Sequence, residues 1–198
     1  MNTRIVLFVA LGFMGLMIFA AILFPDFLEN IMLTPAYYNH ILFLHVLTVM
    51  LFFVNAVVGI FWEARSLSSK NKEVIVHTYK TVTWLDAHFS SPMIILAVSS
   101  GILLGYGNGG IWSSGWLSLS FLLFIFSGLV WIVSDIPSQY KIRDGLERLS
   151  SSIADIPPDF MNLLKRRLFI SLSGVLPLFI VFVLMIYKPD FPSVMDWF

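Results

Sequence analysis

The sequence predicts an all-α protein, a polytopic membrane bundle of five transmembrane helices in which a four-helix core follows one N-terminal helix. Of its 198 residues, 58% are hydrophobic and only 12% are charged, about half the charged fraction of a soluble domain. Five apolar runs each approach the ~20 residues that a helix needs to cross ~30 Å of hydrocarbon. Backbone polar groups in lipid must be satisfied within their own segment, which favours helix for runs of this length.

The five runs form one predicted transmembrane domain that covers residues 1–198. They span about residues 5–24, 41–62, 84–106, 116–134 and 168–187. Trp62, Trp84 and Trp116 lie at run ends, where aromatic belts form at the membrane interface. The first run is predicted to be a retained helix, because its apolar stretch exceeds the ~7–15 residues usual in a cleaved signal peptide.

The segment between the last two runs, residues 138–167, is the only sizeable stretch outside the predicted spans. Ile142, Leu146, Leu149 and Ile153 recur there at roughly helical spacing. The pattern predicts a short amphipathic helix on the inner leaflet, with basic residues toward the lipid headgroups. A docking site for a partner is the alternative.

The distribution of basic residues predicts the orientation in the membrane. Eleven of the twelve Lys and Arg residues lie on one side of a five-helix threading, and only Lys188 lies on the other. Cytoplasmic loops carry the excess of Lys and Arg. We therefore expect a multi-pass protein of the bacterial inner membrane, with the N-terminus in the cytoplasm and the C-terminus in the periplasm.

Ionisable side chains at membrane depth are costly and are therefore candidate functional residues. His45, Asp86 and His88 lie within the predicted spans, and His40 and Lys188 lie at the outer boundary. His45 is about one and a half turns into its helix. An imidazole there can ligate heme iron or copper, or can form a hydrogen bond to a neighbouring helix.

Asp86 and His88 lie near the inner end of the third run. Asp86 is expected to pair with Arg65 or Lys80 at the same depth. In antiparallel helices His88 and His45 would be offset by ~20 Å along the bundle, which disfavours a heme shared by the two histidines.

Met185 lies near the outer end of the last run, level with His45. A His/Met pair is acceptable for heme or copper, although methionine is commonly apolar filler. The sequence has no Cys, which excludes disulfides, thiolate metal sites and c-type heme attachment. It also lacks HExxH, P-loop and G-x-S-x-G motifs, which excludes the corresponding hydrolases and kinases.

An ordered series of residues runs through the last four predicted helices. It comprises His45 at the start of an apolar helix that continues to Asn55, Gly59 and Trp62, then Asp86-x-x-Phe89-x-x-Pro92, Ser100-Gly101, Trp131, Pro137 and Leu184-Met185-x-x-Lys188-Pro189. This series resembles the bacterial membrane family called domain of unknown function 2269. That family is in turn similar to the CopD copper-resistance proteins and the HemJ-type membrane protoporphyrinogen oxidase. HemJ-like proteins bind heme b through a membrane histidine and need a lysine near the last Lys-Pro, so the resemblance implies roles for His45 and Lys188.

Three functional hypotheses follow. The first is a b-type heme protein, a component of a heme-dependent membrane oxidoreductase, that passes electrons between quinone or a partner cytochrome and the periplasmic side. His45 would be the axial ligand, and Met185, Lys188 or His40 would be the opposite ligand or would pair with a propionate. The second is a copper-handling membrane protein that uses the same outer residues. The third is a non-catalytic subunit of a larger membrane complex or homo-oligomer, in which the histidines are structural.

Overall fold

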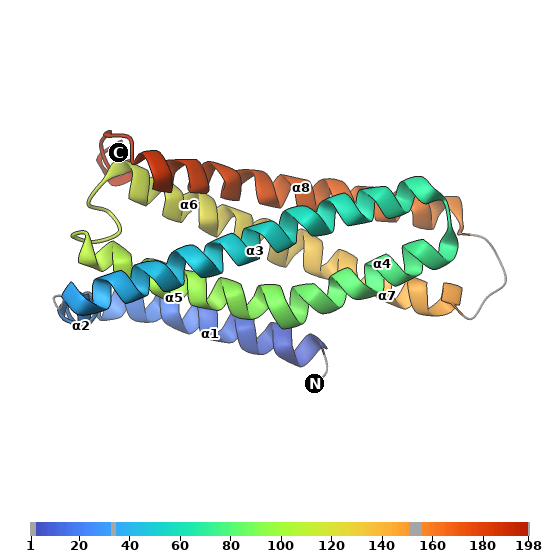
Figure 1. The fold of residues 1–198 in the computed structure, drawn as a ribbon, viewed down its shortest axis with the longest axis horizontal. Helices are drawn as coiled ribbons and strands as arrows, with labels where there is room; N and C mark the ends of the chain where they lie inside the picture. The colour runs from blue at the N-terminus through green and yellow to red at the C-terminus, as the bar shows by residue number, and fades with distance from the viewer. Residues whose placement is uncertain (1–2, 33–34, 151–155, 198) are drawn as a thin grey trace.

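The computed structural model describes residues 3–32, 35–150 and 156–197 of the chain. These residues form a helical bundle (Figure 1), and none of them belongs to a β-strand. In chain order the elements are α1 (Thr3–Leu23), α2 (Pro25–Met32), α3 (Pro35–Ser69), α4 (Lys72–Leu85), η1 (Asp86–Ser90), α5 (Ser91–Gly107), α6 (Gly115–Val130), η2 (Trp131–Asp135), α7 (Ile136–Ser150), α8 (Pro158–Tyr187) and η3 (Val194–Trp197).

Four long helices build the bundle. α3 and α8 are single helices, whereas α4 and α5 are joined through the π-helical turn η1, and α6 and α7 through the π-helical turn η2. All four are long and apolar enough to cross a membrane. The predicted all-α membrane bundle is therefore confirmed for its four-helix core. The N-terminal helix contributes a shorter apolar stretch, Leu11–Leu23, so its status as a fifth span stays a prediction.

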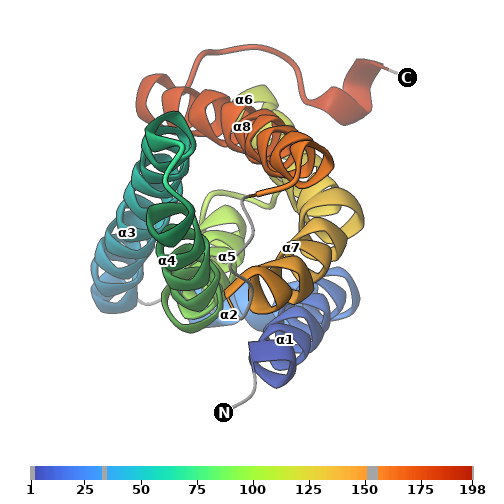
Figure 2. The same ribbon diagram turned by 90° about the vertical axis from the view of Figure 1, so that its right-hand side faces the viewer.

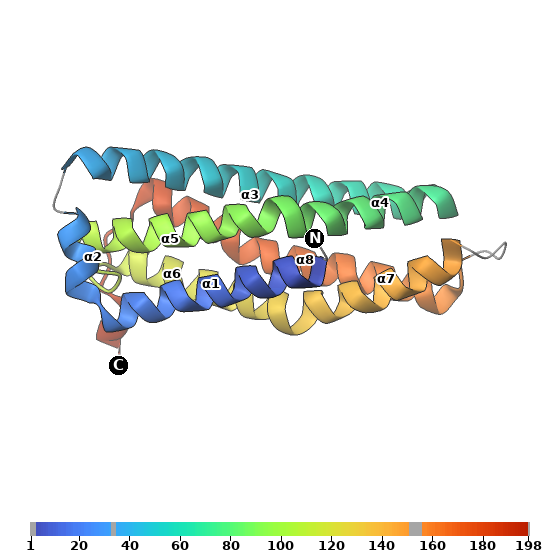
Figure 3. The ribbon, with the colours of Figure 1, turned by 90° about the horizontal axis from the view of Figure 1, so that it is seen from below.

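The two ends of the bundle differ. One end carries α2, the α5–α6 connection and the C-terminal segment, and we call it the α2 end (Figure 1). The opposite end, where α4 begins and α7 ends, is called the α4–α7 end. α1 runs beside α5 from the α2 end over only part of the bundle length (Figure 3). Its 21 residues correspond to about 31 Å at 1.5 Å per residue, close to the thickness of the hydrocarbon core.

The α4–α7 end projects beyond α1 and has an apolar core of its own. Figure 2 views the bundle from this end, with α4, α7 and α8 around its interior. The buried residues there are Ile75, Tyr79, Ile142, Leu146 and Leu164. With 35 residues, α3 is about 52 Å long, which is more than the bilayer core requires. Burial of apolar side chains between the helices stabilises this extension as it does in a soluble bundle.

The helix predicted within residues 138–167 is present as α7, but its surroundings differ from the prediction. α7 continues α6 instead of forming a separate surface helix. Ile142 and Leu146 are 2% exposed and belong to the apolar core, and Leu149 is also buried. The apolar face therefore packs against α4 and α8 and not against the inner leaflet. Ile153, the fourth residue of the pattern, lies outside the described residues.

Local sequence signals explain where the helices at this end begin. The Asn71 side chain accepts hydrogen bonds from the backbone N–H groups of Glu73 and Val74, which caps the start of α4. Lys70, just before it, has a φ of 54°, so the chain reverses direction there. Pro157 and Pro158 stand at the start of α8, where proline's missing N–H costs no helical hydrogen bond.

Candidate functional site

The His45 imidazole is held against α5 by hydrogen bonds. Its Nδ1 lies 2.9 Å from the backbone oxygen of Ala97 and 3.3 Å from Oγ of Ser100. A carbonyl oxygen can only accept, so Nδ1 carries a hydrogen and donates it to Ala97. Among the described residues none forms a hydrogen bond with the other ring nitrogen, Nε2. A neutral His45 in this arrangement therefore keeps its lone pair on Nε2.

Gly101 makes this close approach possible. A Cβ built on Gly101 would lie 2.9 Å from Cε1 of His45 and 3.3 Å from its Nδ1. Any larger residue would push the ring away from α5. The Ser100-Gly101 pair therefore positions the His45 ring. Ser100 contributes a polar contact, and Gly101 leaves the space that the imidazole occupies.

His45 lines a cavity of about 420 Å³ near the α2 end, which we call the His45 cavity. Its walls are mainly apolar and come from α3, α5, α6 and α8, and the volume is typical of sites for small molecules and cofactors. Met185 and Lys188 line the same cavity. The structure therefore brings together three of the four residues that the sequence proposed for cofactor binding.

Lys188 is positioned by its backbone and by an aromatic ring. It ends α8 with a φ of 42°, a left-handed conformation that is uncommon for a residue with a side chain. Its Nζ lies 5.2 Å from the centre of the Trp116 ring, within the range of a cation–π contact. The C-terminal segment is fixed beside it, because the Gly115 N–H donates to the Phe191 oxygen at 3.1 Å.

The remaining histidine candidates lie away from this cavity. His40 is exposed and does not line it. His88 stacks on Trp84 with the ring centres 4.8 Å apart, and its Nδ1 lies 3.0 Å from the Trp84 backbone oxygen. In the described part of the chain, no three His, Cys, Asp or Glu side chains form a group that could hold a metal ion.

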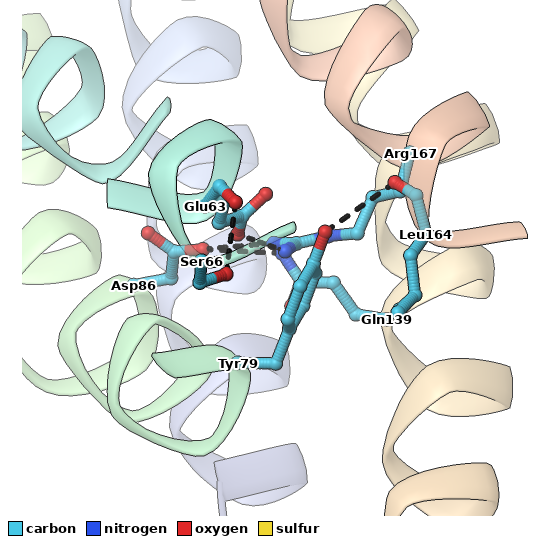
Figure 4. Close-up of polar contacts among 7 residues, drawn as sticks. All are labelled: Glu63, Ser66, Tyr79, Asp86, Gln139, Leu164 and Arg167. Carbon is cyan, nitrogen blue, oxygen red and sulfur yellow. Dashed lines mark hydrogen bonds and ion pairs between the residues drawn. The ribbon is translucent and has the colours of Figure 1, made fainter. Parts of the chain in front are cut away.

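A second group of polar residues lies further along the bundle, at the level of η1 (Figure 4). Arg167 from α8 reaches between two carboxylates and forms ion pairs with Glu63 of α3 and, at 3.5 Å, with Asp86 of η1. Gln139 of α7 donates to Asp86 at 3.2 Å. We call these four residues the Arg167 cluster. It draws together all the long helices of the bundle.

Asp86 therefore has a different partner from the one predicted. Its ion pair is with Arg167, whereas Arg65 and Lys80, the predicted partners, are both exposed. The prediction chose these two basic residues because they are expected at the same depth as Asp86, and it did not consider Arg167. Arg167 is close to it because α8 and η1 both pack against α3.

Glu63 and Arg167 were not among the sequence candidates, although a signal for both was present. Glu63 directly follows the second apolar run, and Arg167 directly precedes the last one. Asp86 lies at the matching end of the third run. Opposite charges at the same end of three neighbouring runs indicate an ion pair between helices at one depth.

The Arg167 cluster borders a cavity of about 170 Å³, the Arg167 cavity, which Asn55, Ser90 and Ser127 also line. The Asn55 amide donates to Oγ of Ser90 at 2.8 Å, which joins α3 to η1. The cavity adjoins the π-helical turns η1 and η2, and turns of this kind occur frequently at functional sites.

Comparison with known proteins identifies the membrane protein family to which the chain belongs, but it does not identify an activity. A family model described as "Predicted integral membrane protein (DUF2269)" matches residues 39–189, most of the chain. The match covers α3 to α8 and leaves out α1 and α2. No curated protein and no solved structure matches the chain.

Proposed function

The chain belongs to the DUF2269 family of integral membrane proteins, and we propose that it is a b-type heme protein of the bacterial inner membrane. The heme would occupy the His45 cavity, with Nε2 of His45 as the axial ligand. When bound, heme supplies one-electron chemistry. A membrane quinone or a partner cytochrome is the class of electron donor or acceptor that we propose for it.

The observation that carries the proposal is the hydrogen bond from Nδ1 of His45 to Ala97. Histidines that ligate a metal almost always donate their other ring N–H to a carbonyl or carboxylate, which fixes the tautomer and the ring orientation. His45 has this arrangement, and it faces a cavity of cofactor size. A histidine that only joined two helices could form the same hydrogen bond. Such a purely structural role would not require a cavity next to the ring.

Heme is favoured over a copper ion by the number of protein ligands available. The porphyrin supplies four nitrogen ligands, so a single imidazole is enough to attach the iron. A copper ion would need several protein donors, and the described residues contain no cluster of three or more His, Cys, Asp or Glu. His45 and Met185 alone would leave a copper site incomplete.

Two further residues of the cavity have properties that suit a heme. Met185 lines the same cavity as His45 and could supply a second ligand, because a His/Met pair is an established ligand set for heme iron. Lys188 lines the cavity, and its ammonium group could pair with a propionate carboxylate. His40, which is exposed, has no role in this proposal.

The experiment is an absorbance spectrum with iron analysis of the protein purified from membranes without chelators. We expect a Soret band and a reducible alpha band, with about one iron per chain. Copper in place of iron would support the copper-handling alternative. Absence of both metals from folded protein would contradict both cofactor proposals and would leave the role of a subunit in a larger complex.

We also propose the orientation that places the α2 end on the periplasmic side. It rests on the excess of basic residues at the α4–α7 end. The sequence has no Cys, so single cysteines can be introduced without background. Asp190 and Lys80 are exposed at opposite ends of the bundle. In intact cells, an impermeant thiol reagent should label Asp190→Cys but not Lys80→Cys, and the reverse pattern would contradict the orientation.

A further inference from the structure

The two cavities lie next to each other in the interior of the bundle. Four apolar side chains line both of them, namely Phe52, Ile94, Phe124 and Leu178. These shared side chains form the boundary between the His45 cavity and the Arg167 cavity. A molecule bound in the Arg167 cavity would therefore lie beside a heme bound in the His45 cavity, and two redox groups placed in this way can exchange electrons directly.

The Arg167 cavity has a polar end and an apolar end. The polar end is the Arg167 cluster, whose charged residues lie where the predicted apolar runs begin or end, at the boundary of the hydrocarbon core. The apolar end reaches Phe52 and Leu178, which lie well inside their apolar runs. We therefore expect a ligand of this cavity to combine polar atoms with an apolar body.

Two uncharged residues in the wall of this cavity, Asn55 and Ser90, have hydrogen-bond donors to offer. One amide hydrogen of Asn55 is donated to Oγ of Ser90. In the described part of the chain, neither the second amide hydrogen of Asn55 nor the hydroxyl hydrogen of Ser90 forms a hydrogen bond. Ser90 is only 8% exposed, and buried hydroxyl groups usually have a partner. A ligand with a carbonyl oxygen would supply the acceptor for both donors.

The size and position of the cavity suit a single ring with an apolar tail. The volume is about 170 Å³, and an engineered apolar cavity of about 150 Å³ binds benzene. Val58 and Trp62 line the cavity and are also exposed on the surface of α3. An apolar tail attached to the ring can therefore extend past these two side chains into the lipid.

We propose that the Arg167 cavity binds the ring of a membrane quinone, with a quinone carbonyl oxygen accepting hydrogen bonds from Asn55 and Ser90. A quinone is uncharged and carries its carbonyl groups on an apolar ring, as this wall requires. The phosphate of a phospholipid would instead compete with Glu63 and Asp86 for Arg167, which disfavours a lipid headgroup as the occupant. The redox role of the bound quinone rests on the proposed heme function, whereas its binding does not.

The test is a titration of purified His45→Ala protein in lipid nanodiscs with decylubiquinone, followed by quenching of tryptophan fluorescence. Trp62 and Trp131 line the cavity, so a quinone bound there lies close to two indole rings. The His45→Ala background removes the proposed heme ligand, so heme does not contribute to the quenching. We expect saturable quenching. Its half-saturation concentration should rise about fivefold in Asn55→Leu, as expected for the loss of one hydrogen bond to the ligand.

Ser90→Ala should raise the half-saturation concentration in the same way, and this small change keeps the test available if Asn55→Leu does not fold. Ser99→Ala is the matched control, because Ser99 lines neither cavity and its loss should leave binding unchanged. Quenching that does not saturate would overturn the proposal, and so would equal half-saturation in the Ser90 and Ser99 variants. The heme content of the wild type is measured separately, so failure of the quinone site and failure of the heme proposal give different results.

Discussion

Replacing Arg167 by methionine is expected to cost about 3–5 kcal/mol of stability, the range measured when one partner of a buried ion pair is removed. The side chain is 3% exposed and contacts both Glu63 and Asp86. Methionine keeps much of the apolar stem but leaves two carboxylates facing each other in the interior. Denaturant titration of the purified protein in detergent, followed by circular dichroism, would measure the change.

The neighbouring arginine provides a matched control. Arg166 is exposed, so Arg166→Met removes the same charge from the same helix and should change the stability by less than about 0.5 kcal/mol. The double variant Arg167→Met/Glu63→Gln should recover part of the loss, because the most deeply buried carboxylate is then neutral. Equal stabilities for Arg166→Met and Arg167→Met would mean that the ion pairs contribute little to folding.

The sequence predicted the membrane core well because the bilayer imposes a simple rule. Only helices of about 20 apolar residues satisfy their own backbone across the hydrocarbon. The four runs beginning near residues 41, 84, 116 and 168 therefore correspond to the four long apolar helices of the structure. The same rule could not predict how far the helices continue beyond the membrane, since outside lipid a helix may end or extend.

The extension at the α4–α7 end illustrates this limit. The spacing of Ile142 and Leu146 predicted an amphipathic helix, and a helix is present there. Periodicity shows that a helix has an apolar face but does not identify what covers that face. Lipid headgroups and a neighbouring helix require the same pattern. In the structure Ile75 of α4 and Leu164 of α8 cover it.

For the candidate sites too, the sequence predicted some features and not others. Depth within the predicted helices placed His45, Met185 and Lys188 at one level, and all three line one cavity. Depth alone could not predict the rotation of each helix. For this reason His40 was retained among the candidates although it is exposed. For the same reason the sequence did not predict the actual partner of Asp86, which is Arg167, 81 residues away in the sequence.

If the His45 cavity holds heme, His45→Ala should abolish most of the Soret absorbance while the protein remains folded. Removing the axial ligand eliminates the bond that fixes the iron. His40→Ala is the control, because it removes an imidazole from the same helix at an exposed position outside the cavity. Its spectrum should match the wild type. Equal heme content in the two variants would show that His45 is not the ligand.

Gly101→Val tests the same geometry without removing any ligand. Its Cβ would lie 2.9 Å from Cε1 of His45, so the imidazole must move away from Ala97. Overpacking of this kind costs about 1–3 kcal/mol, and each 1.4 kcal/mol corresponds to a tenfold loss of affinity. Heme affinity should therefore fall about tenfold. Gly12→Val in α1 is the control, since a Cβ there meets nothing within 4 Å. If Gly101→Val bound heme as Gly12→Val does, the imidazole orientation held by α5 would not determine binding.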